Sequence, residues 1–156
     1  MIRVMFVCLG NICRSPMAEG IFRHLVDSAG LAGQIQADSA GTSGYHVGER
    51  PHPGTRQVLR AHGIHYSHRS QQVSSRRLPQ ADYVVAMDRE NLRDLKRMDR
   101  RAVLDGKLSL LLDEAPQTGH REVPDPYYSG GFERVYQLVE AGCEGLLARI
   151  RQEHGL

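Results

Sequence analysis

Strand-like and helix-like segments alternate along this chain, and the alternation constrains the fold more than any other feature of the sequence. Residues 2–7 form an apolar, β-branched run that is typical of a strand buried on both faces. Further strands are predicted over residues 35–40, 83–87 and 108–112. Apolar residues at helical spacing predict helices over residues 17–29, 55–62, 89–97 and 132–150. This order predicts a parallel sheet with helices on both faces.

The chain has 156 residues, which is enough for a single domain, residues 1–156, with one continuous core. It contains no internal repeat and no linker. In open parallel sheets, ligands bind beyond the carboxyl ends of the strands. Three segments that follow predicted strands are therefore expected to meet at that edge, namely residues 8–15, 42–48 and 114–131.

The net charge of +2 suits an anionic substrate but is far from the dense basic stripe of nucleic-acid-binding proteins. The three cysteines form no paired framework. No apolar run approaches the ~18 residues that a membrane helix needs. We therefore expect a cytoplasmic protein with free thiols and with neither a membrane nor a nucleic-acid partner.

The segment CLGNICRSP at residues 8–16 lies between the first strand and the first helix, and its residue types predict an anion-binding loop. Gly10 allows a tight turn that directs successive backbone N–H groups inward. Ser15 is the predicted helix cap and Pro16 the predicted first helical residue, so the positive end of the helix dipole faces the same point. We call residues 8–15 the phosphate loop.

Cys8 and Arg14 are the reactive candidates in the phosphate loop. A helix N-terminus and a nearby arginine favour the thiolate form of a cysteine, which could attack phosphorus. The planar guanidinium of Arg14 could hold two phosphate oxygens. On these residues alone, Cys8 could instead be a buried thiol at a strand end, with Arg14 in a salt bridge elsewhere. Cys13 is either a packed small residue or the partner of Cys8 in a reversible disulfide.

The spacing C-x5-R is not specific by itself, because Cys143 and Arg149 repeat it within the last predicted helix. There, Cys143 lies on the apolar stripe of the helix, which is typical of a packed core thiol. The strand before Cys8 and the loop after it are what distinguish the first pair.

Residues 114–131, which we call the acid loop, form an 18-residue stretch without periodicity, and loops of this length in compact domains are often functional. Thiolate attack on a phosphate ester requires a separate proton donor for the leaving oxygen. Asp125 lies between two prolines that stiffen the backbone, and it is the candidate donor. Tyr127 and Tyr128 could wall an aromatic substrate. A solvated aspartate in a surface turn is the alternative.

Histidines recur at every third residue in His62, His65 and His68, which superficially resembles a metal site. No carboxylate or thiol nearby in the sequence completes a tetrahedral set, and Gly63 interrupts any helix that would align the rings. We therefore expect no metal site, with His62 and His65 on the surface. His46 is either a contact at the rim of the site or a solvated loop residue.

With both loops considered, the chain resembles the low-molecular-weight protein tyrosine phosphatases. The segments that carry the resemblance are CLGNICRSP at 8–16, DSAGTSGY at 38–45, HGIHYSH at 62–68, MDRENLRDL at 87–95 and DPYY at 125–128. These segments span essentially the whole chain.

The resemblance implies an α/β three-layer sandwich, doubly wound around a four-stranded parallel sheet in the order 2-1-3-4. It implies Cys8 as the nucleophile, Arg14 as the phosphate clamp, and Asp125 as general acid and then base. The other residues that it assigns to phosphate or substrate binding are Leu9, Gly10, Asn11, Ile12, Cys13, Ser15, Tyr45, Tyr127 and Tyr128. Among the loop-supporting contacts, it implies that Ser15 hydrogen-bonds Cys8. It also implies a network of Asn11, Ser39 and His68.

The implied activity is hydrolysis of phosphotyrosine in proteins through a phosphocysteine intermediate. The same resemblance implies no metal or other cofactor, inhibition by phosphate and similar oxyanions, and a monomer or weak dimer.

Three other functions fit the residues less well. A thiol-dependent arsenate reductase of the same fold needs two further redox cysteines near the end of the third strand, and residues 82–89 contain none. A protein-arginine phosphatase of the same family carries Thr where Ile12 stands and lacks the tyrosine pair. A catalytically silent phosphate-binding module is expected to lack the thiol, the arginine or the acid, and all three are present.

Overall fold

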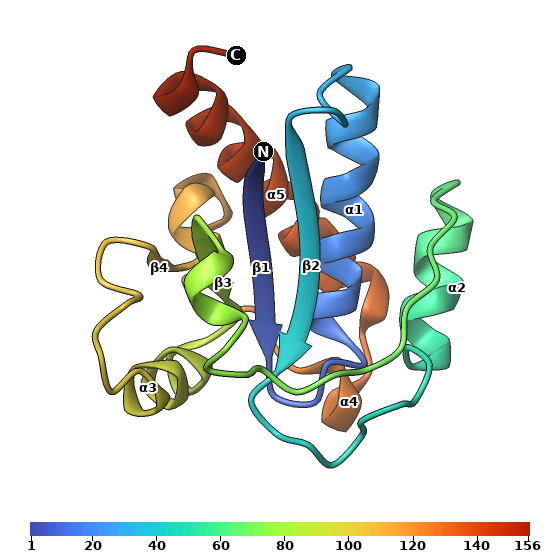
Figure 1. The fold of residues 1–156 in the computed structure, drawn as a ribbon. Coiled ribbons are helices and arrows are strands. Elements are labelled where there is room, and N and C mark those ends of the chain that lie inside the picture. Colours follow the sequence, from blue (N-terminus) through green and yellow to red (C-terminus); the bar gives the residue numbers. More distant parts are fainter.

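The computed structural model describes residues 1–156 and contains one sheet of four strands. The strands are β1 (Ile2–Cys8), β2 (Ile35–Gly41), β3 (Tyr83–Ala86) and β4 (Leu108–Leu110). All neighbouring strands run parallel, and their order is β2-β1-β3-β4, which confirms the expected order. The arrows of β1 and β2 in Figure 1 point to one end of the molecule, and both chain termini lie at the other end.

Five α-helices surround the sheet: α1 (Arg14–Ser28), α2 (Pro53–Ala61), α3 (Arg89–Met98), α4 (Pro126–Ser129) and α5 (Phe132–His154). Alternating residues of β1 separate the two faces of the sheet. Phe6 faces the larger core beneath α1 and α5, whereas Met5 and Val7 face a smaller core that includes Leu95 of α3. Helix α2 packs outside this arrangement, against α1 and α5. The structure is thus the expected three-layer sandwich.

The start of α1 differs from the sequence-based prediction. The helix begins at Arg14 and its cap position is Cys13, so Ser15 is not the cap and Pro16 is not the first helical residue. The left-handed residue of the phosphate loop is Asn11, with φ of 56°, rather than Gly10. The hydroxyl of Ser15 is engaged by the side chain of Cys8 instead of a helix N–H group.

Two later segments also differ from the prediction. Strand β4 ends at Leu110, because the backbone turns into a 3-10 helix over Leu111–Glu114. The acid loop is not wholly irregular, since it contains a 3-10 helix at Pro116–Thr118 and the single-turn helix α4. Pro126 begins α4 with a fixed φ, and the carboxylate of Asp125 caps it.

Helix α3 is capped by Asp88, the residue directly before it. The side chain of Asp88 accepts a hydrogen bond from the N–H of Asn91 at 2.8 Å, and the Asn91 side chain accepts one from the N–H of Asp88 at 3.3 Å. This reciprocal capping box fixes the chain direction immediately after β3.

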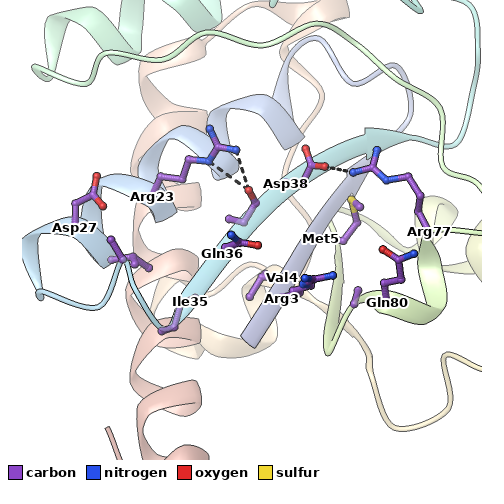
Figure 2. A pocket seen from close by; sticks show the side chains of 14 residues that line it. Arg3, Val4, Met5, Arg23, Asp27, Ile35, Gln36, Asp38, Arg77 and Gln80 are labelled. Atoms are coloured by element: carbon purple, nitrogen blue, oxygen red, sulfur yellow. Dashed lines mark hydrogen bonds and ion pairs between the residues drawn. The ribbon is translucent and has the colours of Figure 1, made fainter. Parts of the chain in front are cut away.

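A cavity of about 610 Å³ lies along the first halves of β1 and β2 and is remote from the loops that follow the strands. Figure 2 shows that two arginines, Arg23 and Arg77, contact β2 there. The guanidinium of Arg23 donates to the carbonyl oxygen of Ala37 at 2.9 and 3.3 Å, and Arg77 pairs with Asp38. The contact of Arg23 occupies a backbone carbonyl group that an unprotected edge strand would expose to other chains. None of the helices is long and apolar enough to cross a membrane.

Candidate active site

The phosphate loop connects the end of β1 to the start of α1 and wraps around the sulfur of Cys8. The Sγ atom of Cys8 lies 3.3 Å from the backbone nitrogen of Asn11, which donates to it, and 3.0 Å from the hydroxyl oxygen of Ser15. Cys8 is 2% exposed. A sulfur that faces an N–H group, a hydroxyl and a helix N-terminus is placed where negative charge is favoured.

Gly41, at the end of β2, packs against the phosphate loop and was not singled out from the sequence. A Cβ atom at this position would lie 2.7 Å from the carbonyl oxygen of Leu9 and 3.1 Å from the nitrogen of Asn11, so only glycine fits. The next two residues of the chain then donate backbone hydrogen bonds to Cys8 and Leu9. A glycine directly after a predicted strand was the available signal, because close backbone approach is a common reason for it.

The side chain of Asn11 lies at the centre of a buried hydrogen-bond network, as the family resemblance implies. Its Oδ1 accepts from the backbone N–H of Gln71 at 3.0 Å, which identifies this atom as the oxygen. The Nε2 of His68, 2.8 Å from the same oxygen, must therefore carry a proton and donate. The Nδ2 of Asn11 donates to Ser15 at 2.8 Å and to Ser39 at 3.0 Å.

These donors and acceptors give the network one direction. Since Ser15 Oγ accepts from Asn11, its own hydrogen is free to point at the sulfur of Cys8. Ser39 accepts from Asn11 in the same way and donates to Glu19 at 2.7 Å. The left-handed backbone of Asn11 is thus held by contacts to three separate segments of the chain.

Glu19 is the buried acid of this network and was missed in the sequence. Its carboxylate is 1% exposed, accepts from Ser39 and from the Tyr66 hydroxyl at 2.8 Å, and pairs with Arg23 at 2.7 Å. Burial raises the pKa of Glu19, while these three partners favour the charged form. The only signal in the sequence was a lone acid within the apolar first half of α1.

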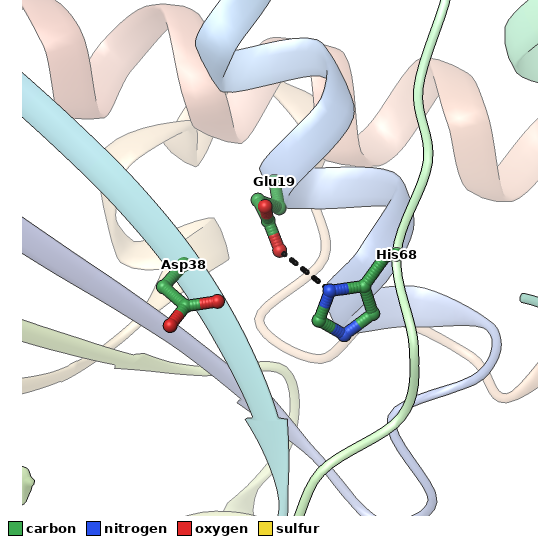
Figure 3. A group of neighbouring side chains, drawn as sticks. All are labelled: Glu19, Asp38 and His68. Atoms are coloured by element: carbon green, nitrogen blue, oxygen red, sulfur yellow. Dashed lines mark ion pairs between the residues drawn. The ribbon is translucent and has the colours of Figure 1, made fainter. Parts of the chain in front are cut away.

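Two carboxylates accompany His68, contrary to the expectation from the local sequence. Figure 3 shows Glu19 and Asp38 beside the His68 ring, with all three side chains offering atoms within 4.8 Å of one another. The Asp38 oxygens already accept from Ser39 N–H and the Gln71 amide and pair with Arg77. We therefore interpret the cluster as support for the phosphate loop.

The other two histidines of the series do not join that cluster. The His62 ring stacks on Tyr136 with 3.8 Å between centroids and lies 2.9 Å from an oxygen of Glu133. Both His62 and His65 are exposed, as predicted.

Arg14 is 3% exposed and is oriented by contacts with two loops. Its Nη1 pairs with Asp88 at 2.6 Å and donates to the carbonyl oxygen of Val123 at 3.0 Å, whereas its Nη2 lies 3.4 Å from Asp125. Burial alone lowers the pKa of Arg14, but the negative charges of Cys8, Asp88 and Asp125 outweigh burial and raise it. The guanidinium is therefore held as a cation beside the sulfur.

The three loops that were expected to meet do so around a pocket of about 360 Å³. The phosphate loop forms its floor through Cys8, Leu9, Gly10, Ile12, Cys13 and Arg14. Asp125 lies on the wall, where its Oδ1 accepts from the N–H of Tyr127 at 3.1 Å and its Oδ2 faces Arg14. The aromatic residues Tyr45, Tyr127 and Tyr128 line the entrance with rings that are 48–84% exposed.

His46 belongs to this entrance, which resolves the alternative left open by the sequence. Its ring lies between Tyr45 and Tyr127, at centroid distances of 4.8 and 5.8 Å, and a Cβ at Gly10 would lie 3.0 Å from it. The mouth of the pocket is consequently ringed by flat side chains, with the phosphate loop beneath them.

The site combines three groups at the edge of an open parallel sheet: a thiol at the floor of an anion-binding loop, an arginine beside the thiol, and a carboxylate on the pocket wall. This combination is typical of the cysteine-dependent phosphatases. The sequence also matches the family described as low molecular weight phosphotyrosine protein phosphatase over residues 3–155. The chain belongs to this family.

Individual relatives agree with this assignment. The low molecular weight protein-tyrosine-phosphatase YfkJ of Bacillus subtilis is 50% identical over 157 residues, covering 100% of both chains. Its crystal structure superimposes with a TM-score of 0.93 and covers 98% of this chain and 96% of that chain. The protein tyrosine phosphatase of Entamoeba histolytica has a TM-score of 0.92 at 36% identity, covering 99% of each chain.

A Drosophila protein described as an arginine phosphatase is also similar, with 34% identity, a TM-score of 0.86 and coverage of 95% of this chain and 97% of its own. The fold therefore does not by itself distinguish between phosphorylated residue types.

Proposed function

We propose that this protein hydrolyses phosphotyrosine in proteins through a phosphocysteine intermediate, with Cys8 as nucleophile, Arg14 as phosphate clamp and Asp125 as general acid and then base. The observation that supports these roles most is the environment of the Cys8 sulfur. A backbone N–H and a hydroxyl point at it within 3.3 Å, and the cation of Arg14 lies in the same pocket as the carboxylate of Asp125.

In the first step, the Cys8 thiolate attacks phosphorus, the S–P bond forms, and the bond from phosphorus to the tyrosyl oxygen breaks. The carboxyl group of Asp125 supplies the proton for that oxygen. In the second step, Asp125 accepts a proton from water, whose oxygen attacks phosphorus and releases inorganic phosphate. The Ser15 hydroxyl and the Asn11 N–H stabilise the thiolate that departs.

The two arms of Arg14 have different tasks in this mechanism. Nη1 is committed to Asp88 and the Val123 carbonyl and fixes the plane of the guanidinium. The contact of Nη2 with Asp125, at 3.4 Å, is longer than the about 2.7–2.9 Å of a charge-assisted hydrogen bond. Nη2 is therefore the arm that can turn to equatorial phosphate oxygens without loss of a strong contact.

The entrance favours a phenyl ring over a guanidinium as the group that carries the phosphate. Tyr127 and Tyr128 meet at 80° with 5.2 Å between centroids, which forms a corner for edge-to-face contact with an aromatic ring. Ile12 adds an apolar side chain at the floor. Hydrolysis of phosphoarginine is the second candidate, since a relative with that description shares the fold. The free, buried cysteines suit a reducing cytoplasm, where we place the enzyme.

Activity is expected to be independent of metal ions. The oxyanion-binding groups of this site are N–H donors, a hydroxyl and a guanidinium, and the nearby carboxylates already have partners. Hydrolysis of an aryl phosphate should therefore survive excess EDTA and be inhibited by vanadate, which resembles phosphate. Loss of activity in EDTA that a divalent metal restores would contradict the mechanism.

Cys13 is expected to protect Cys8 from irreversible oxidation. Burial, followed by the charge of Cys8, raises the pKa of Cys13 to about 12, so Cys13 remains a thiol and does not compete as nucleophile. Peroxide converts the Cys8 thiolate to a sulfenic acid, which removes that neighbouring charge. The Cys13 sulfur then displaces water and forms a disulfide, which a dithiol reduces.

The measurement is the activity recovered by a dithiol after exposure to peroxide. We expect nearly full recovery for the parent protein and partial recovery for Cys13→Ala, whose sulfenic acid oxidises further. Equal recovery of the two proteins would refute the protective role.

A further inference from the structure

A second groove, of about 400 Å³, lies beside α2 and is cationic. Three arginines line it, Arg50, Arg56 and Arg60, together with His65 and the half-buried Tyr66. No carboxylate is among its lining residues. The larger cavity at the edge of β2 differs in this respect, because Asp27 and Asp38 offset its arginines (Figure 2). Of these two cavities, the groove beside α2, which we call the cationic groove, is the one lined by arginines without any carboxylate.

The arginines of the cationic groove have no acidic partner in the protein. Arg50 and Arg60 are exposed and form no ion pair. Arg56 donates only to the carbonyl oxygen of Pro51, at 3.0 Å. Elsewhere, Arg14, Arg23, Arg77, Arg121 and Arg149 each pair with a carboxylate. The guanidinium groups of the groove are thus available to an external anion.

The distribution of charge along the sequence gives the groove its sign. Residues 39–81 contain six arginines and a single acid, Glu49, which is engaged by His46. The remaining residues contain fourteen basic and seventeen acidic side chains. The net charge of +2 is therefore the sum of a basic segment and a slightly acidic remainder. Such a local excess of positive charge can attract acidic partners.

The segment that lines the rim of the active site leads directly, along the chain, into the cationic groove. Tyr45 and His46 line the entrance, and the chain continues from them to Arg50. Two residues later, the N–H of His52 donates to the carbonyl oxygen of Ile12 in the phosphate loop at 2.7 Å, which anchors this connection. In Figure 1, α2 runs upward from the end of the molecule to which β1 and β2 point, and the segment that follows α2 returns to that end. A peptide with its phosphotyrosine over Cys8 can therefore continue along α2.

We propose that the cationic groove receives an acidic stretch of the phosphoprotein substrate, beside the phosphotyrosine that enters the active site. This inference rests on the proposed function and defines its substrate class. Glutamate and aspartate side chains complement the forked donors of Arg50, Arg56 and Arg60. The groove is a short pocket next to the rim rather than an extended basic stripe, which favours a peptide over a nucleic acid.

The test compares two phosphotyrosyl peptides that differ only in having glutamates or glutamines beside the phosphotyrosine. The variant is the double substitution Arg50→Gln with Arg60→Gln, because both side chains are exposed and make no hydrogen bond that folding requires. The matched control is Arg100→Gln with Arg101→Gln, which removes the same charge from the loop after α3. A small aryl phosphate, which reaches only the pocket, reports basal activity.

We expect the groove variant to lower kcat/KM for the acidic peptide about 3- to 10-fold, because it removes two exposed charge pairs. The glutamine peptide and the aryl phosphate should be unaffected, and the control variant should resemble the parent. Added salt should reduce the preference of the parent for the acidic peptide.

Failure of this proposal is distinguishable from failure of the proposed function. If the parent does not hydrolyse the aryl phosphate, the proposed function fails. The groove can still be tested in that case by measuring how tightly Cys8→Ser binds each of the two peptides, with and without the groove substitutions. If the parent shows no preference for the acidic peptide, or if the control variant loses the preference equally, the docking proposal is overturned. Binding of the acidic peptide by the groove variant as tightly as by the parent overturns it as well.

Discussion

Cys8→Ser is expected to abolish turnover of aryl phosphates and phosphotyrosyl peptides while the protein still folds and binds phosphate. A serine hydroxyl fills nearly the same space and can accept the hydrogen bond from Asn11 N–H, but it remains protonated and is a poor nucleophile. Loss of a nucleophile typically lowers kcat by about 10⁴-fold or more. Single-turnover assays, with phosphate affinity measured by calorimetry, check both parts of this expectation.

Cys143→Ser is the matched control, because it makes the same substitution at the other C-x5-R pair. Cys143 is 0% exposed in α5, and its thiol lies 3.6 Å from the carbonyl oxygen of Ala18. Activity should remain near that of the parent, with a loss of about 1–3 kcal/mol in the free energy of unfolding, as for burial of a polar group. Substantial turnover in Cys8→Ser would refute the assignment of the nucleophile.

Asp125→Asn is expected to slow phosphotyrosine cleavage by roughly 10²–10⁴-fold, the usual contribution of general acid catalysis. Asn caps helices about as well as Asp, so α4 and the tyrosines that follow should keep their positions. The decrease in cleavage rate should be smaller when the leaving group is a nitrophenolate, which leaves without a proton, and larger when it is an unactivated phenolate. Hydrolysis of the phosphoenzyme should also slow, since the same group then acts as base.

The measurement is the pre-steady-state rate across a series of substituted phenyl phosphates. In Asp125→Asn, the rate should depend more steeply on the pKa of the leaving phenol than it does in the parent. Glu122→Gln is the control in the same loop, because Glu122 Oε2 accepts from the N–H of Arg89 at 2.9 Å and so belongs to the start of α3. If the dependence of the rate on the pKa of the leaving phenol is the same in Asp125→Asn as in the parent, Asp125 is not the general acid. Glu122 is then the next candidate.

Features that depend on local sequence were predictable here. Hydrophobic spacing placed the strands and the long helices, and the position of the phosphate loop after β1 placed Cys8 at the carboxyl edge of the sheet. The family resemblance supplied the strand order and the contacts of Asn11, Ser15, Ser39 and His68. Cys143 was assigned to the core from its helical stripe, and it is buried there.

Features that depend on contacts between distant segments were not predictable. Gly41 matters because its Cα lies against the backbone of a loop about thirty residues away, and no pattern within β2 reveals that neighbour. Glu19 lies in a helix that otherwise buries apolar side chains, and its partners come from β2 and from the segment after α2. The single turn of α4 is too short to show any periodicity.

Asp88 has a consequence that extends beyond the helix it caps. One of its carboxylate oxygens accepts from the backbone of α3, and the other pairs with Arg14, 74 residues earlier in the chain. The first turn of α3 and the guanidinium are therefore coupled through a single carboxylate. Fraying of a surface helix would in this way be transmitted directly to anion binding, although α3 contributes no side chain to the pocket.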